Sequence, residues 1–173
     1  NNNCPDCDWS LSTQDIPDVI RWTVRYDVPF GPGRKHLTNG PVAQIAGGWS
    51  LGAFYSWDNG TPLRLSSPND SNSFGGGTNM RPTLVPGASP VIENRGTLTD
   101  GSLYFNPGAF VRTAPFAFGN APRNVADLRS PGTNNLDMLL EKRVDLPGVA
   151  ALDIRAEIFN AFNYVQRAGP GTN

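Results

Sequence analysis

Strict alternation of apolar and polar residues marks the first clear element of the chain, residues 19–28. This period of two residues is typical of a β-strand with one apolar face. The residues on the expected apolar strand face are Ile20, Trp22, Val24, Tyr26 and Val28. A half-buried sandwich strand and a transmembrane barrel strand are both compatible with the pattern, because a barrel strand also spans about 9–11 residues.

The same alternation predicts strands over 49–57, 136–144 and 150–159, and a short returning strand over 63–66. Aromatic residues stand near both ends of the 49–57 stretch, as in the girdles of outer-membrane barrels, although they also suit an ordinary half-buried sheet. A short helix is expected over 41–46. The predicted fold class is therefore all-β, an antiparallel sheet or partial barrel with at most one short helix.

Residues 66–133 have almost no sustained period and are rich in Gly, Pro, Asn and Ser. A stretch of this kind within a compact domain is a functional loop, a loop packed by its own side chains, or a disordered segment. Four phenylalanines favour packing, and we expect them to anchor the loop onto a sheet rather than to form an aromatic ligand cage. These loop anchors are Phe105, Phe110, Phe116 and Phe118. Residues 1–173 are expected to form a single β-rich domain.

The composition supports short strands and many turns, since only 38% of the residues are hydrophobic and the chain holds 19 Gly and 16 Pro. Lys plus Arg number 14 and Asp plus Glu number 15, so the net charge is close to zero. A protein that binds nucleic acid by neutralising phosphates needs a basic surface. We therefore expect no nucleic-acid partner.

The two cysteines, Cys4 and Cys7, form a Cys-x-x-Cys motif that is compatible with a disulfide, half a metal site or a redox pair. A zinc site needs two further ligands, and the chain has one histidine and no third cysteine. A redox pair needs a following helix to lower the thiol pKa. We favour a local disulfide, which implies an oxidising compartment.

Alternating charges mark one face of the 150–159 strand, where Asp153, Arg155 and Glu157 follow one another at every second residue. Glu141 on the preceding strand is placed to face them. We expect a cross-strand ion ladder here rather than a catalytic carboxylate pair. The lone histidine, His36, lies in a turn, and no serine stands in a nucleophile-elbow context. We therefore expect no enzymatic activity, no metal and no cofactor.

Seven phrases occur along the chain in order: "DIPDVIRWTVRYDVPFGPGRK", "GGWSLGAFYSWDNGTPLRL", "RPTLV", "FNPGAF", "FGNAPRN", "LRSPGTNNLDMLLEKRV" and "LDIRAEIFNAFN". Together they resemble the C-terminal part of the barrel of large TonB-dependent outer-membrane receptors of the Oar-like type. The resemblance covers nearly the whole chain, from Asp15 to Asn163. It implies strands from a barrel of about 22 strands, with substrate-recognising loops to which only residues 66–133 correspond.

The plug domain, the TonB-contacting motif and the closing C-terminal strand of such receptors have no counterpart in these 173 residues. We expect the chain, which begins with Asn1, to be a processed product or an excerpt. An opened barrel leaves unpaired strand edges, and such edges pair readily with other chains.

The expected function is therefore that of a structural, self-associating subunit whose partners are other copies of itself. Strand-edge or tail exchange would join the copies into a homo-oligomer or an extracellular filament. The alternative is a segment of an intact TonB-dependent transporter or receptor barrel, in contact with outer-membrane lipid. Both hypotheses predict an extracellular or bacterial outer-membrane location.

Overall fold

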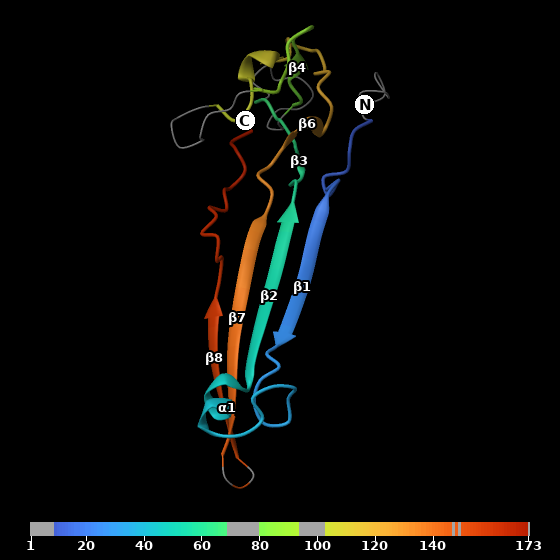
Figure 1. Ribbon diagram of the computed structural model, residues 1–173. Helices are drawn as coiled ribbons and strands as arrows, with labels where there is room; N and C mark the ends of the chain where they lie inside the picture. Colours follow the sequence, from blue (N-terminus) through green and yellow to red (C-terminus); the bar gives the residue numbers. More distant parts are fainter. Residues whose placement is uncertain (1–8, 69–79, 94–102, 147, 149, 173) are drawn as a thin grey trace. The chain divides into compact units, whose positions relative to one another are not determined.

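The computed structural model describes residues 9–68, 80–93, 103–146, 148 and 150–172 (Figure 1). The predicted disulfide between Cys4 and Cys7 lies outside the described residues. Two compact units are present. Residues Val19–Asp58 and Thr133–Gln166 form what we call the sheet unit. Residues Asn1–Asp18, Asn59–Gly132 and Arg167–Asn173 form the loop unit.

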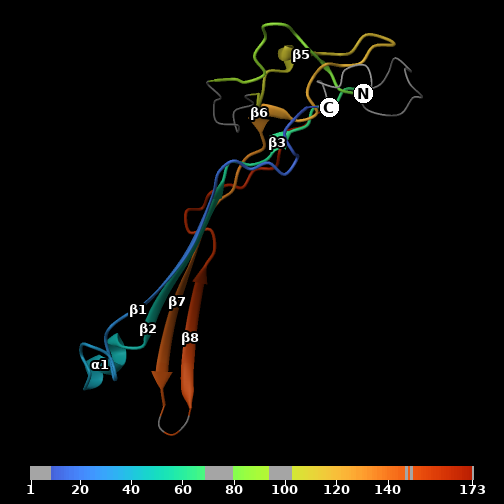
Figure 2. The same ribbon diagram turned by 90° about the vertical axis from the view of Figure 1, so that its right-hand side faces the viewer.

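The sheet unit contains one four-stranded antiparallel sheet in the order β1-β2-β7-β8 (Figure 2). Its strands are β1 (Val19–Asp27), β2 (Trp49–Asp58), β7 (Asn134–Asp145) and β8 (Ala151–Ile158). A single six-residue helix, α1 (Pro41–Ala46), interrupts the β1–β2 connection. Proline opens this helix, where its missing N–H costs nothing and its fixed φ suits the first turn.

The central pair of this sheet, β2 and β7, joins segments that are far apart in the sequence. Ser50 lies opposite Glu141, and Leu51 lies opposite Leu140. β1 and β8 flank this pair, and every residue of these two outer strands is exposed. Both faces of the sheet are therefore open over its outer strands.

The loop unit is built around two short strand pairs. β3 (Pro62–Leu63) pairs with β6 (Val125–Arg129), and β4 (Thr83–Leu84) pairs with β5 (Phe110–Val111), which follows the 3-10 turn η3 (Pro107–Ala109). A small buried cluster lies at the β3–β6 pair. Its members are Leu63, Leu65, Val125 and Leu128, and Val91, Tyr104, Phe105 and Phe110 pack against it.

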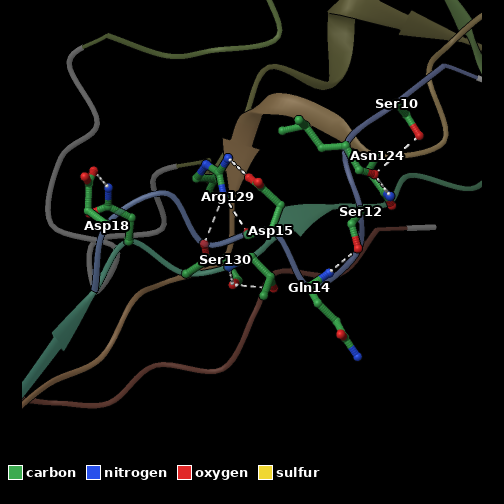
Figure 3. Close-up of polar contacts among 12 residues, drawn as sticks. Ser10, Ser12, Gln14, Asp15, Asp18, Asn124, Arg129 and Ser130 are labelled. Atoms are coloured by element: carbon green, nitrogen blue, oxygen red, sulfur yellow. Dashed lines mark hydrogen bonds and ion pairs between the residues drawn. The ribbon is translucent and has the colours of Figure 1, made fainter. Parts of the chain in front are cut away.

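A salt bridge ties the N-terminal segment of the loop unit to β6 (Figure 3). The Arg129 guanidinium contacts the Asp15 carboxylate at 2.6 Å and also donates to the backbone carbonyls of Asp15 and Gly60. The hydroxyl of Tyr104 donates to the carbonyl of Arg129 at 2.6 Å. These bonds join four segments of the loop unit around one partly buried side chain.

Several elements differ from the sequence-based expectations. The short strand expected over 63–66 is confined to Pro62–Leu63. In the described parts of region 66–133, expected to be loop, there are three short strands and one 3-10 turn. These strands are two to five residues long, too short to show a period, and their partners lie far away in the sequence. Helix α1 has the bounds expected from the sequence.

Candidate functional site: the two faces of the sheet

One face of the four-stranded sheet, which we call the apolar face, is almost entirely hydrophobic. Paired residues of antiparallel strands point to the same side of a sheet, so the register assigns each side chain to a face. The apolar face consists of Ile20, Trp22, Val24, Tyr26, Trp49, Leu51, Ala53, Tyr55, Trp57, Leu136, Met138, Leu140, Val144, Leu152, Ile154, Ala156 and Ile158. The rings of Trp22 and Tyr55 lie 5.7 Å apart across β1 and β2.

Large apolar side chains of this face are left open to solvent within the described chain. The exposed fraction is 50% for Val24, 54% for Tyr26 and 55% for Ile154. Soluble proteins rarely expose contiguous apolar patches of more than a few hundred Å². A surface of this kind marks contact with another apolar phase, either protein or lipid.

Lys142 is a charged residue on the apolar face, where it pairs with Trp49 across β2 and β7. Its ammonium group donates to the backbone carbonyls of Gln44, Ile45 and Gly47 at the C-terminal end of α1. The same group lies 5.3 Å from the centre of the Trp49 ring. Lys142 is only 8% exposed, so its charge is compensated by three carbonyl dipoles and an aromatic face.

Trp49 forms a second bond to α1, because its indole N–H donates to the Ile45 carbonyl at 2.9 Å. The end of a six-residue helix is thus held to the apolar face by two side chains from neighbouring strands. Orphan carbonyls at a helix C-terminus are the groups that most need such donors. The β1–β2 connection is therefore fixed to one end of this face.

The opposite face, which we call the charged face, holds a network of ion pairs that joins β1, β7 and β8 across β2. Arg25 of β1 contacts Glu141 of β7 at 2.7 Å, and Glu141 lies 3.9 Å from Arg155 of β8. Arg155 in turn contacts Glu157 at 2.6 Å. Positive and negative groups therefore alternate across the sheet.

Arg25 can reach Glu141 across β2 because the residue of β2 opposite Arg25 is Gly52. Without a side chain at Gly52, the arginine can lie over β2 toward β7. A Cβ on Gly52 would approach Leu139 Cβ at 3.2 Å. Gly52 therefore leaves room both for Leu139 and for the long ion pair.

An open groove of about 900 Å³ lies between the charged face and the β1–β2 connection, which contributes Pro32, Gln44 and Gly47 to its lining. Arginine and carboxylate side chains line much of it: Arg25, Asp27, Arg34, Glu141, Arg143, Asp145, Asp153 and Arg155. The Ser50 hydroxyl donates to Asp27 at 2.6 Å. Such a lining of balanced charge suits water and polar solutes, in contrast to the hydrophobic side of the sheet.

The structure brings together three of the four residues expected to form an ion ladder. Arg155 contacts Glu141 and Glu157, whereas Asp153 lies 3.7 Å from Arg143 instead. Sequence reasoning missed Arg25 and Arg143 as members. Both stand at polar positions of alternating strands, but only the cross-strand register shows that they face the ladder.

The four expected loop anchors separate into two pairs. Phe105 and Phe110 pack edge to face with ring centres 6.1 Å apart, against the buried cluster of the loop unit. Phe116 is 79% exposed and Phe118 is 44% exposed.

The apolar strand face expected for β1 is found in the sheet. Four of its five residues, Ile20, Trp22, Val24 and Tyr26, lie on the apolar face, and Val28 follows the end of the strand. The N–H of Val28 donates to the Trp49 carbonyl at 2.9 Å.

Among the described residues, no group of three or more His, Cys, Asp or Glu side chains is placed to hold a metal ion. None of the helices in that part of the chain has the length and hydropathy that crossing a bilayer requires.

A sheet with one hydrophobic face and one charged face is the construction of a membrane barrel wall. The chain belongs to the outer membrane beta barrel domain family, whose model matches residues 1–173. This membership agrees with a location at the bacterial outer membrane or cell surface and with a structural or transport role. Comparison with curated proteins and comparison with solved structures each gave no match.

Proposed function

We propose that the chain supplies wall strands to the barrel of a TonB-dependent outer-membrane receptor. In this proposal the apolar face contacts lipid and the charged face lines the lumen. The observation that carries it is the pairing of an exposed hydrophobic face with a charged face on one sheet. Transmembrane barrels alternate apolar-out and polar-in along every strand.

The dimensions of the sheet support this role. The four strands have 9, 10, 12 and 8 residues, and a spanning strand needs about 9–11. Aromatic side chains stand at both ends of the apolar band, with Tyr26 and Trp49 toward α1 and Trp22, Tyr55 and Trp57 toward the other end. Tyr and Trp favour the two membrane interfaces, where a ring can be half buried and still meet water.

The connections between strands support one orientation of the wall. Barrels of this kind have short periplasmic turns and longer extracellular loops. The β7–β8 turn, residues 146–150, and the β1–β2 connection, residues 28–48, lie at one end of the sheet (Figure 1). The much longer β2–β7 connection, residues 59–133, leaves from the other. In our proposal the long connection is extracellular and carries the substrate-binding loops.

The TonB-dependent class is supported by the ordered phrases that the chain shares with Oar-like receptors, within a family match that covers outer-membrane barrels generally. The charged groove is compatible with a lumen because it is open and its ionic side chains pair with one another.

Paired cysteine substitutions on one strand test the proposal. Val24→Cys and Thr23→Cys place thiols on opposite faces of β1 in adjacent positions, in a chain whose Cys4 and Cys7 are replaced by serine. The chain is refolded into phospholipid vesicles and exposed to a water-soluble maleimide. We expect slow labelling of Val24→Cys and fast labelling of Thr23→Cys. Equal labelling of both variants would overturn the wall proposal.

A second candidate function is self-association into an oligomer or extracellular filament. The exposed outer strands β1 and β8 favour it, since each presents an edge that another copy can extend. The variant Thr23→Pro tests it. In an antiparallel pair every second residue bonds to the neighbouring strand, and Val28 bonds to Trp49 of β2. Thr23 is an odd number of residues from Val28, so its N–H points away from β2, toward the free edge.

Negative-stain microscopy without detergent gives the readout. We expect filaments or rings from the unmodified chain and their loss in Thr23→Pro. Monomers alone, or particles that form only in detergent, would exclude the self-association candidate.

A further inference from the structure

We propose that the β1–β2 connection, residues 28–48, is a membrane-surface anchor that binds the anionic phospholipid surface of the leaflet next to it. This inference rests on the proposed wall function and assigns a lipid partner to the β1–β2 connection. It concerns the segment that the Lys142 and Trp49 bonds hold against one end of the apolar face.

The first argument is the position of α1 relative to the apolar band. Trp49 and Lys142 belong to the apolar face, and both donate to carbonyls at the C-terminal end of α1. Figure 1 shows α1 beside the ends of β7 and β8, at the end of the sheet where these two side chains stand. Trp and Lys are the side chains that favour the headgroup level.

The second argument is the exposed surface of α1. Its one buried residue is Ala43, whereas Val42 is 60% exposed and Ile45 is 74% exposed. Residues three apart are neighbours on a helix surface, so these two side chains form one apolar patch. Trp49 of the apolar face donates to the Ile45 carbonyl at 2.9 Å, which brings this helix next to that face. Interfacial helices insert such patches about 5–10 Å into the boundary between headgroups and acyl chains.

The third argument is charge. Residues 28–48 contain no Asp or Glu, and they contain Arg34, Lys35 and His36. Arg34 lies 3.7 Å from Asp27 and lines the charged groove, so the exposed Lys35 is the cation that this connection offers to a lipid surface. A lysine and an exposed apolar patch in one connection are together complementary to an anionic lipid surface. Each Lys or Arg near such a surface strengthens binding about fivefold.

The orientation agrees with this partner. The α1 end of the sheet carries the shorter connections, which place it on the periplasmic side in the proposed wall. The chemistry that the anchor recognises is a phosphodiester headgroup above acyl chains. Free phosphate offers only the charge and gives the patch of Val42 and Ile45 no contact.

Vesicle binding of the full chain tests the inference. The unfolded chain is diluted from urea into vesicles of phosphatidylcholine alone or with 30 mol% phosphatidylglycerol, on the order of the anionic content that gives membranes a negative surface potential. We expect the unmodified chain to bind the anionic vesicles about fivefold more strongly, with an advantage that falls as salt rises.

Three variants separate the contributions. Lys35→Gln should remove most of the preference for the anionic vesicles. The double variant Val42→Ser/Ile45→Ser should weaken binding to both vesicle types about thirtyfold. Val111→Ser, which changes an exposed aliphatic residue of the loop unit, should bind like the unmodified chain.

The labelling of Val24→Cys distinguishes the two possible failures. If Val24→Cys is shielded but Lys35→Gln and Val42→Ser/Ile45→Ser bind both vesicle types as the unmodified chain does, the anchor is refuted and the wall proposal stands. If Val24→Cys is not shielded, the wall proposal fails, and the anchor that rests on it fails too.

Competition with inorganic phosphate separates a lipid surface from a simple anion site. Phosphate at millimolar concentration should not displace the chain from the vesicles, and displacement would show a simple anion site instead.

Discussion

Replacing Lys142 with methionine should release α1 while leaving the sheet paired. Methionine keeps the length and apolar character of the lysine stem but removes the ammonium group that donates to the carbonyls of Gln44, Ile45 and Gly47. Hydrogen bonds from charged groups contribute about 1.5–3 kcal/mol each, and the desolvation cost of the buried lysine offsets part of the total. We expect α1 docking to lose about 2–3 kcal/mol.

Hydrogen exchange measures this loss at single amides. The Gly47 amide donates to the Ala43 carbonyl at 2.9 Å, and the Val28 amide donates to the Trp49 carbonyl at 2.9 Å. A six-residue helix is unstable alone, so its protection depends on docking. In Lys142→Met the Gly47 amide should exchange about 30- to 150-fold faster. The Val28 amide, which reports the β1–β2 pairing, should keep its rate.

The matched control is Lys35→Met, which removes an exposed lysine from the same connection and should leave both amides unchanged. Unaltered exchange at Gly47 in Lys142→Met would refute the docking role of Lys142. Equal acceleration at Gly47 and Val28 would show that the lysine supports the whole sheet instead.

Three further predictions concern single side chains. Arg129→Met removes the partly buried pair with Asp15 and should lower the stability of the loop unit by about 2–3 kcal/mol, seen as faster exchange of the Ser130 amide; an unchanged rate would contradict it. Asp153→Asn breaks an exposed pair and should change the free energy of unfolding in urea by less than about 1 kcal/mol, so a larger effect would show a stronger network. Gly60→Ala should cost about 1–3 kcal/mol in urea unfolding, because the glycine has a φ of +74° and an added Cβ would collide with the Ser130 carbonyl; a stable variant would refute this.

The strands of the sheet were predictable because their signal is local. Alternation over residues 19–28 indicates a strand whatever lies beside it, and the described strand β1 spans Val19–Asp27. The same holds for α1, which begins at Pro41 after the turn. Local patterns of two or three residues suffice for these elements, whereas the choice of partner strands depends on contacts across the sheet.

The register and its consequences could not be predicted in this way. Arg25 meets Glu141 only because β2 lies between β1 and β7 with Gly52 at the crossing point. Lys142 stands at a position of β7 where the alternation calls for an apolar residue. A lysine at such a position was the one local signal that another group compensates its charge. The partner that does so, the C-terminal end of α1, comes from a segment almost a hundred residues earlier.

The pairing of β2 with β7 also determines how the sheet must assemble in time. β7 and β8 are joined by the short turn at residues 146–150, so this hairpin closes with little loss of chain freedom. Closing the connection between β2 and β7, roughly fifteen times longer, costs about 2 kcal/mol more in loop entropy. We expect the β1–β2 and β7–β8 hairpins to form first and to meet last along the central seam, which makes that seam the slow step of folding.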